Sequence, residues 1–531
     1  MHLVETQATK PSPPHRVTMS SRSRLIPLIV TGATAILYLA TLSRHYTGDS
    51  IEYALAIELG NRAYLLDPSH PLLHPLGLAF FRLWQTLGWT GQSLVPLQVL
   101  NALAGAVCAG LVTDIVRRLT GLARLALVTG LGFAVSGGLW MLSVEAEFVS
   151  VPLAAALLIL WTLFVVTPEQ AGSAKYVILL ALVTAVAFWS YASGALLYFV
   201  VLTGLLVDQR LPRSVCRRQA LIYSGALLFV FIPATTLFLS QWSRGDWARV
   251  PAYFLGRGGY SSFALRDLPH GVYAFLRSLA LYPHLSLVGT TRQFLVQASP
   301  AGRGLFVAYY ALALLVVCTP LALTVRHRQS LLAAYRRPMA VLAVWSAGFA
   351  VFAFFWVPGD VSFWLPLLAA WWLLLALAIS AVTSDATRTA KTGRWLTGLT
   401  VAVIALAIAN ATFEVLPRRD LATNLPYQVA MDVAAQTGDD VIFLTRGDDI
   451  SGLYLAYFAG RQVFYATPET LVSLHSMLPP SAENAAPRVV TLDVDSNRSD
   501  WWQALLATSP WQAVEPHSQL RAGMLIELAP R

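Results

Sequence analysis

Residues 25–53, LIPLIVTGATAILYLATLSRHYTGDSIEY, decide the fold, because an apolar run leads directly into two carboxylates. An α-helix needs about 20 apolar residues to cross the hydrocarbon core of a bilayer, and the first part of this stretch is apolar over such a length. Asp49 and Glu52 follow, and His70 and His74 come later in the same loop. Ionisable groups are costly beside lipid, so their concentration here indicates a function at a membrane surface.

The composition of the whole chain indicates a multi-pass helical membrane protein. Of 531 residues, 56% are apolar and 12% are charged, and the mean hydropathy is +0.59. A soluble domain carries about 25% charged residues. The net charge of +9 does not indicate nucleic-acid binding, because the basic residues cluster in short loops between apolar runs. Cys108, Cys216 and Cys318 are too scattered for a disulfide framework or a zinc site.

We expect about eleven spans, with the N-terminus inside and residues 1–24 as a cytoplasmic tail. The expected spans are 25–43, 94–116, 123–142, 148–167, 174–190, 191–207, 220–240, 303–325, 339–357, 361–382 and 395–412. This topology places the Arg-rich loops inside and most acidic residues outside. Counting residues 72–87 as a further span would reverse that pattern, so we interpret them as an interfacial or partly inserted helix.

The regions outside the membrane fall into two loops and a C-terminal domain. Long outer loops are expected at 44–93 and 241–302, within a membrane domain of 25–412. After residue 412 the hydropathy falls, and we expect 413–531 to be a small α/β soluble domain on the outer side. Its expected strands are 441–444, 462–465, 489–492 and 524–528, with a helix at 451–458 between the first two.

The motifs of the first loop resemble those of GT-C glycosyltransferases. Gly48-Asp49-Ser50-Ile51-Glu52-Tyr53, followed by His74-Pro75-Leu76-Gly77 and Asn101, is similar to the bacterial branch related to protein O-mannosyltransferases. That branch carries Asp-x-x-Glu and then His-Pro-Pro-Gly, so Leu76 departs from it. Residues 140–147 resemble the second acidic outer loop of the same family, and residues 441–465 resemble the outer domain of aminoarabinose transferases.

The resemblance implies an enzyme of the cytoplasmic (inner) membrane that transfers a sugar from a polyprenyl-phosphate donor to an acceptor hydroxyl at the outer face, with inversion. Such a reaction needs a base for the acceptor proton and cations or hydrogen-bond donors for the departing phosphate. The sugar stays open, and so does the acceptor, which could be a protein, a lipid or a glycan. The alternative is a transporter or flippase for a polyprenyl-linked lipid or a small molecule, which would need ionisable residues within the spans, where they are scarce.

Asp49 is the candidate base, and Glu52 is a candidate for binding the acceptor or orienting Asp49. The structural alternative is a capping box, with Asp49 as the N-cap of a helix and Glu52 three residues later. His70 and His74 could donate hydrogen bonds to the leaving phosphate, although a His-Pro pair at residues 74–75 also suits a helix start.

Glu147 could face the same cavity as Asp49, or be a water-exposed residue at a helix end. Arg257, in a Gly-rich stretch that ends at Tyr260, could clamp the phosphate or extend toward lipid headgroups, and Tyr260 is a further candidate for binding the donor or the acceptor. We interpret Asp360 as part of a turn at a helix end. No cluster has metal-ligand spacing, so no metal site is predicted, although some GT-C relatives hold a divalent cation through several carboxylates.

Overall fold

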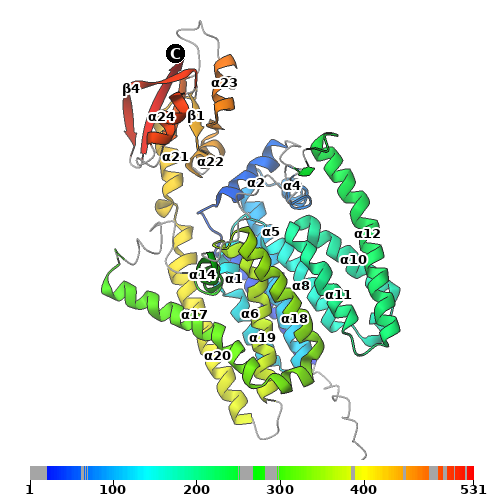
Figure 1. Cartoon of the computed structure of the whole chain (residues 1–531). Helices are drawn as coiled ribbons and strands as arrows, with labels where there is room; N and C mark the ends of the chain where they lie inside the picture. Colours follow the sequence, from blue (N-terminus) through cyan, green and yellow to red (C-terminus); the bar gives the residue numbers. More distant parts are fainter. Residues whose placement is uncertain are drawn as a thin grey trace, which may run out of the picture.

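The computed structural model describes residues 21–60, 65, 67, 70–248, 250–251, 267–281, 296, 298–383, 389–439, 441–446, 450–477, 488–493, 499–507, 509–520 and 523–530. Its helices form one bundle, and a C-terminal unit with a β-sheet lies at one end of that bundle, next to α2 (Gly48–Leu59) (Figure 1).

Each expected span coincides with a helix or a pair of helices. These are α1 (Ile26–Ala40), α5 (Leu94–Thr120), α6 (Ala123–Ala134) with α7 (Gly137–Ser143), α8 (Ser150–Val165), α10 (Ala174–Ser190), α11 (Leu197–Leu206), α12 (Arg213–Ser243), α17 (Pro300–Arg326), α18 (Arg328–Trp356), α19 (Leu365–Thr383) and α20 (Thr389–Asn410). Among the described residues, 7 helices are long and apolar enough to cross a membrane. The α6–α7 pair is bent by 61°, and α8, α10 and α11 are shorter. The number of crossings and their orientation therefore stay predictions.

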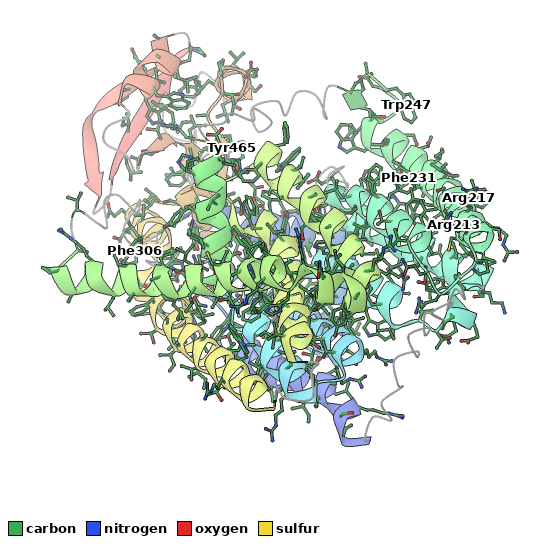
Figure 2. The ribbon with its side chains drawn as sticks, turned by 60° about the horizontal axis from the view of Figure 1, so that its bottom comes forward. Arg213, Arg217, Phe231, Trp247, Phe306 and Tyr465 are labelled. Carbon is green, nitrogen blue, oxygen red and sulfur yellow. The ribbon has the colours of Figure 1, made fainter. Side chains whose placement is uncertain are left out.

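Two helices at the edge of the bundle, α12 and α17, expose apolar side chains. On α12 these include Leu221, Leu228, Phe229, Ile232 and Leu237, and on α17 they include Leu305, Val307, Leu314, Leu315 and Leu321. Exposed apolar faces of this extent are expected where lipid surrounds a helix. Figure 2 shows Arg213 and Arg217 near one end of α12 and Trp247 beyond its other end. Basic and interfacial aromatic residues flank membrane spans in this way.

The first long loop, which we expect on the outer side, folds into two helices, α2 and α4 (Leu73–Thr86). The first ends at Gly60, whose φ of 59° lies in the left-handed region that glycine adopts readily. The second covers the segment that we interpret as interfacial, and at 14 residues it is short for a span. Its buried residues include Leu73, Gly77 and Phe81. The second expected outer loop contains α14 (Leu268–Leu279), which the sequence analysis did not predict.

The C-terminal unit is a mixed five-stranded sheet with the strand order β2-β1-β3-β5-β4. Its strands are β1 (Val441–Thr445), β2 (Gln462–Tyr465), β3 (Arg488–Asp493), β4 (Trp511–Leu520) and β5 (Gly523–Pro530), and its helices are α21 (Leu425–Gln436), α22 (Ile450–Ala459), α23 (Pro468–Met477) and α24 (Ser499–Ala507). The four expected strands and the helix at 451–458 are confirmed. Strand β4 was not predicted, because its sequence, WQAVEPHSQL, is polar and contains a proline.

Candidate active site

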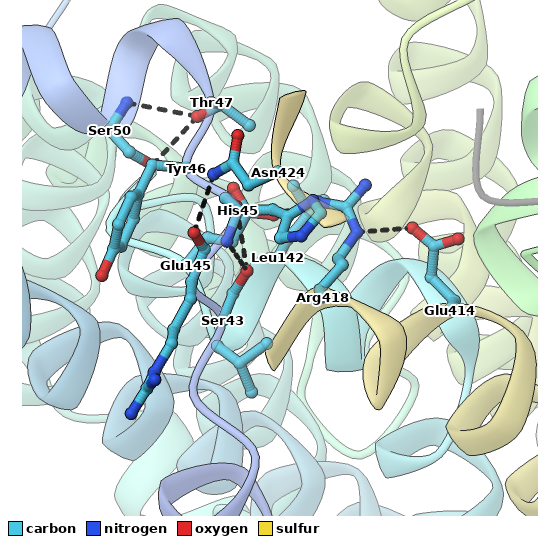
Figure 3. A network of polar contacts seen from close by, with 12 residues as sticks. Ser43, His45, Tyr46, Thr47, Ser50, Leu142, Glu145, Glu414, Arg418 and Asn424 are labelled. Carbon is cyan, nitrogen blue, oxygen red and sulfur yellow. Dashed lines mark hydrogen bonds and ion pairs between the residues drawn. The ribbon is translucent and has the colours of Figure 1, made fainter. Parts of the chain in front are cut away.

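The chain that leads into α2 is fixed to the C-terminal unit by buried and half-buried polar contacts. His45 Nε2 lies 2.9 Å from Thr423 Oγ1 and 3.0 Å from the carbonyl of Asp420. The Tyr454 hydroxyl accepts from the Tyr46 amide at 2.7 Å and donates to the Tyr46 carbonyl at 2.9 Å. Figure 3 shows His45 and Tyr46 beside Ser43, Asn424 and Arg418. The two parts of the molecule therefore meet directly beside the start of α2.

The N-cap of α2 is Thr47, not Asp49. Thr47 Oγ1 accepts from the Ser50 amide at 3.2 Å (Figure 3), and the helix begins at Gly48. The capping-box interpretation of Asp49 and Glu52 is therefore wrong, because the cap lies two residues earlier than that pattern requires. Asp49 still lies in the first helical turn, where a carboxylate interacts favourably with the helix dipole.

Asp49 is accessible to solvent, yet protein surrounds it closely enough that burial raises its pKa. The negative charges of Asp360 and Asp67 raise this pKa further, whereas His70 lowers it. Carboxylates with a raised pKa are typical of active sites.

Glu52 points toward the C-terminal unit. Its Oε1 accepts from the Tyr465 hydroxyl at 2.9 Å, and burial raises the pKa of its carboxyl. Further along α2, Glu58 Oε1 accepts from the Tyr457 hydroxyl at 2.6 Å and from the Ser93 amide at 2.7 Å. Glu58 therefore helps to dock the outer unit, whereas the Glu52–Tyr465 pair is exposed beside Asp49.

A second pair of acids lies between α7 and α8. Glu145 is fully buried and forms an ion pair with Arg418, whose Nε also donates to Glu414 at 2.6 Å (Figure 3). Glu147 is half-buried, and among the described residues its Oε2 has no hydrogen-bond partner. Burial, followed by the charges of Glu145, Asp360 and Asp49, raises the pKa of Glu147 well above its usual range. Arg418 alone thus cannot neutralise the negative charge of Glu145, Glu414 and Glu147.

The two histidines of the first loop occupy different environments. His70 is half-buried, and its Nδ1 lies 3.3 Å from Asp67 Oδ2. His74 is buried, and among the described residues neither of its ring nitrogens has a hydrogen-bond partner. Burial lowers the pKa of His74 to about 4, so its ring is neutral. It packs edge-on against Tyr53 at 4.9 Å between ring centroids, which favours a packing role over a direct phosphate contact.

A line of aromatic rings connects the acids to an apolar cavity. The His70 ring lies 4.7 Å from that of Tyr191, which is 6.1 Å from Phe363. Tyr191 and Phe363 both line a cavity of about 540 Å³, including its open mouth, together with Val149, Gly194, Phe352 and Ser362. Two of these lining residues, Val149 and Ser362, lie two positions in sequence from Glu147 and Asp360. The mainly apolar lining of the cavity suits the apolar part of a ligand.

The structure thus brings together Asp49, His70 and Glu147 from three separated stretches of sequence, and it adds Asp360. Asp360 caps the short 3-10 helix Val361–Trp364, because its Oδ1 accepts from the Ser362 amide at 2.8 Å, so the predicted turn is also present. Its position after a Pro-Gly pair at the end of a span was the only sequence signal for a further role. The only sequence signal at Tyr191 is that residues 190–194 interrupt a long apolar stretch.

Two predicted residues, Arg257 and Tyr260, lie outside the residues that the structure describes. Within the described ranges, no group of three or more His, Cys, Asp or Glu side chains is arranged to hold a metal ion.

Comparisons with known proteins agree with this architecture. The family profile described as dolichyl-phosphate-mannose-protein mannosyltransferase matches residues 69–237. No curated protein matches the chain by sequence. The structure of ArnT from Cupriavidus metallidurans bound to undecaprenyl phosphate is similar at a TM-score of 0.57 and 13% identity, covering 94% of this chain and 97% of that one.

The archaeal oligosaccharyltransferase AglB from Archaeoglobus fulgidus, in complex with an inhibitory peptide and a dolichol-phosphate, is similar at a TM-score of 0.50 and 13% identity. That similarity covers 92% of this chain and 72% of AglB. The bundle with its C-terminal α/β unit is thus similar in fold to ArnT and AglB, and together with the profile match these similarities support a relationship with the GT-C membrane glycosyltransferases.

Proposed function

We propose that this protein transfers a sugar from a polyprenyl-phosphate carrier to an acceptor hydroxyl at the outer face of the cytoplasmic membrane, with inversion at the anomeric carbon. The observation that carries this proposal is an accessible but desolvated carboxylate, Asp49, in a cluster of acids beside an apolar cavity. The similarity to ArnT bound to undecaprenyl phosphate supports a carrier of this type.

The cavity lined by Tyr191 and Phe363 would hold the first isoprene units of the carrier. Its phosphate would then lie near His70. With Asp67 accepting from Nδ1, a protonated His70 ring can donate from Nε2 to a phosphate oxygen. Arg257 and Tyr260 stay candidates for a clamp on the same phosphate. His74, buried and neutral, is not part of this proposal.

Asp49 would act as the general base. The acceptor oxygen attacks the anomeric carbon while its proton passes to the Asp49 carboxylate. The bond between that carbon and the phosphate oxygen breaks, and its electron pair stays with the phosphate. The products are a glycoside, a polyprenyl phosphate and a protonated Asp49, which returns its proton to water. Attack from the face opposite the phosphate inverts the anomeric carbon.

The neighbouring acids fit the charge changes of this reaction. The anomeric carbon becomes positive in an oxocarbenium-like transition state, which negative groups stabilise. Crowding with neighbouring acids raises the pKa of Asp49 and of Glu147 and so disfavours their ionised forms. Because the pKa of Glu147 is raised well above its usual range, Glu147 would hold a proton and offer it as a hydrogen bond to the donor.

The Glu52–Tyr465 pair would receive the acceptor. It is exposed, lies one helical turn from Asp49, and joins the membrane unit to the outer unit. A carboxylate and a phenol can each bind a hydroxyl group. This pair suits a protein, a lipid or a glycan acceptor equally.

Mass spectrometry of envelope glycans, glycolipids and polyprenyl-phosphate sugars tests the proposal. Cells producing the wild-type protein, the Asp49→Asn variant or no protein would be compared. We expect a glycan modification only with the wild-type protein, and accumulation of its lipid-linked donor in the other two. Movement of a lipid-linked sugar across vesicles without any new glycosidic bond would instead support a transporter.

A further inference from the structure

The connection between α7 and α8 contains a strained residue directly after Glu147. Phe148 has a φ of 56°, in the left-handed region that a bulky side chain rarely adopts. Its side chain is fully buried. Such conformations persist only where the surroundings hold them, and they cluster at functional sites.

Two buried side chains of α5 hold the backbone on both sides of Phe148 through hydrogen bonds. The buried Asn101 side chain donates to the carbonyl of Glu145 at 3.0 Å and accepts from the Ser150 amide at 3.0 Å. Gln98 Nε2, also buried, donates to the carbonyl of Val144 at 2.9 Å. These contacts fix the chain before Glu147 and after Phe148, so the residues between them have little freedom to relax.

The Phe148 ring is held by the first outer loop. It stacks on Tyr53 with ring centroids 5.4 Å apart. A Cβ atom at Gly77 would lie only 2.7 Å from Phe148 Cζ, so the absence of a side chain at this position makes room for the ring. Gly77 is helical and its φ is not positive, so it provides space here and not backbone freedom. Gly77, the last residue of the His74–Gly77 motif, thus affects the structure by leaving space for the Phe148 ring.

We propose that Phe148 is a positioning residue, which directs Glu147 toward Asp49 and Asp360 through its left-handed backbone. Gly77 and Asn101 enforce that conformation. A right-handed conformation at Phe148 would turn the chain, and Glu147 and the start of α8 could not both keep their places. This inference rests on the proposed function, because it assigns the role of Glu147 to the same site.

The first test is Gly77→Ala in purified full-length protein, assayed for sugar transfer with the donor identified by mass spectrometry. The added methyl group pushes on Phe148 and displaces Glu147. A misplacement of about 1 Å can lower catalysis by about 100-fold, and we expect transfer to fall by about 10- to 100-fold.

A rescue experiment shows whether the effect passes through Phe148. The methyl group at residue 77 would also approach Ile57 Cδ1, at 2.8 Å. Adding Phe148→Leu to Gly77→Ala shortens the side chain that is struck and should restore part of the transfer. Ile57→Val is the matched control, and it should give no rescue. Equal rescue by both changes would overturn the inference, as would a Gly77→Ala variant with wild-type kinetics or one changed only in thermal stability.

Phe148→Gly keeps the inference testable if Gly77→Ala does not fold. Glycine adopts a φ of 56° without strain, which offsets part of the cost of the cavity that the buried ring leaves, while Glu147 loses its fixed direction. We expect reduced transfer, and wild-type transfer by a folded Phe148→Gly variant would refute the inference. Asp49→Asn in the same assay separates the two proposals. If that variant is inactive and the others behave as wild type, only the positioning role fails.

Discussion

The acids at the two ends of the bundle differ in how their charge is compensated. Asp208 lies in the connection between α11 and α12, at the end of the bundle far from the outer unit (Figure 1). Its Oδ2 lies 2.7 Å from Arg210 and 3.2 Å from Arg337. Burial acts to raise the pKa of Asp208, but the hydrogen bond from Arg210 and the charge of Arg337 bring it below its usual value.

Around Asp49 the neighbouring groups raise the pKa, whereas those around Asp208 lower it. The charges of Asp67 and Asp360 add to the effect of burial, and the pKa of Asp49 is raised. Arg418 is already engaged by Glu145 and Glu414. Acids with their own cations stabilise the fold, whereas acids gathered without enough cations are held in a reactive state. The following predictions test this difference.

Asp49→Asn should have the largest effect on activity. Removing a general base typically costs about 10²- to 10⁴-fold in rate, and we expect a loss of this size in kcat. Thermal stability should not fall, because the substitution removes a desolvated charge that has no ion pair among the described residues. Unfolding midpoints and transfer rates of the same preparation check this. Normal transfer would remove Asp49 from its role.

Asp208→Asn should have the opposite effect, lowering the stability of the protein without changing its activity. It leaves Arg210 and Arg337 without their shared carboxylate, and breaking a buried pair costs about 3–5 kcal/mol in the free energy of unfolding. Transfer per folded molecule should be unchanged. The matched control is Asp246→Asn at an exposed acid, which should change stability by less than about 0.5 kcal/mol. Equal stability of the two variants would contradict the comparison.

Two substitutions should move the acidic limb of the pH–rate profile in opposite directions. Asp49 must be ionised to accept a proton, so transfer is lost as the pH falls through its raised pKa. Asp360→Asn removes a negative neighbour and should shift the limb to lower pH, while the amide oxygen still caps Ser362. His70→Asn removes a favourable neighbour and should shift it to higher pH. Each shift should be up to about one pH unit, and shifts of the same sign would be inconsistent with the cluster.

Substitutions at two tyrosines of the C-terminal unit should distinguish a role in docking that unit onto α2 from a role in binding the acceptor. Tyr457 is buried, and Tyr457→Phe should cost about 1–3 kcal/mol, because Glu58 loses a hydrogen bond. Tyr465→Phe removes an exposed hydrogen bond and should change stability by less than about 0.5 kcal/mol. It should instead raise the KM for the acceptor. Loss of stability without a change in KM would limit Tyr465 to a structural role.

Local patterns in the sequence predicted much of this organisation. Four of the five strands were recognised because each is a short apolar run, and Asp49 was recognised because it follows a span. The N-cap was placed two residues too late, because Thr47 and Asp49 both precede a helical stretch and both residue types are favoured as caps. Nothing local distinguishes them.

The rest of the site depends on tertiary contacts. Asp360 is separated from Asp49 by most of the membrane domain, and only the packing of the bundle brings their charges together. His74 and Gly77 belong to one motif, yet the structure places His74 against Tyr53 and Gly77 under Phe148. A sequence motif indicates that residues matter together, but it does not show which of them face the substrate.

The most direct test is the stoichiometry of the reaction in purified protein. Wild-type protein, supplied with its lipid-linked donor and acceptor, should release one polyprenyl phosphate for each glycosidic bond formed, and Asp49→Asn should release almost none. Glycosidic bonds formed at the wild-type rate by Asp49→Asn, or no release of polyprenyl phosphate by the wild-type protein, would contradict the account.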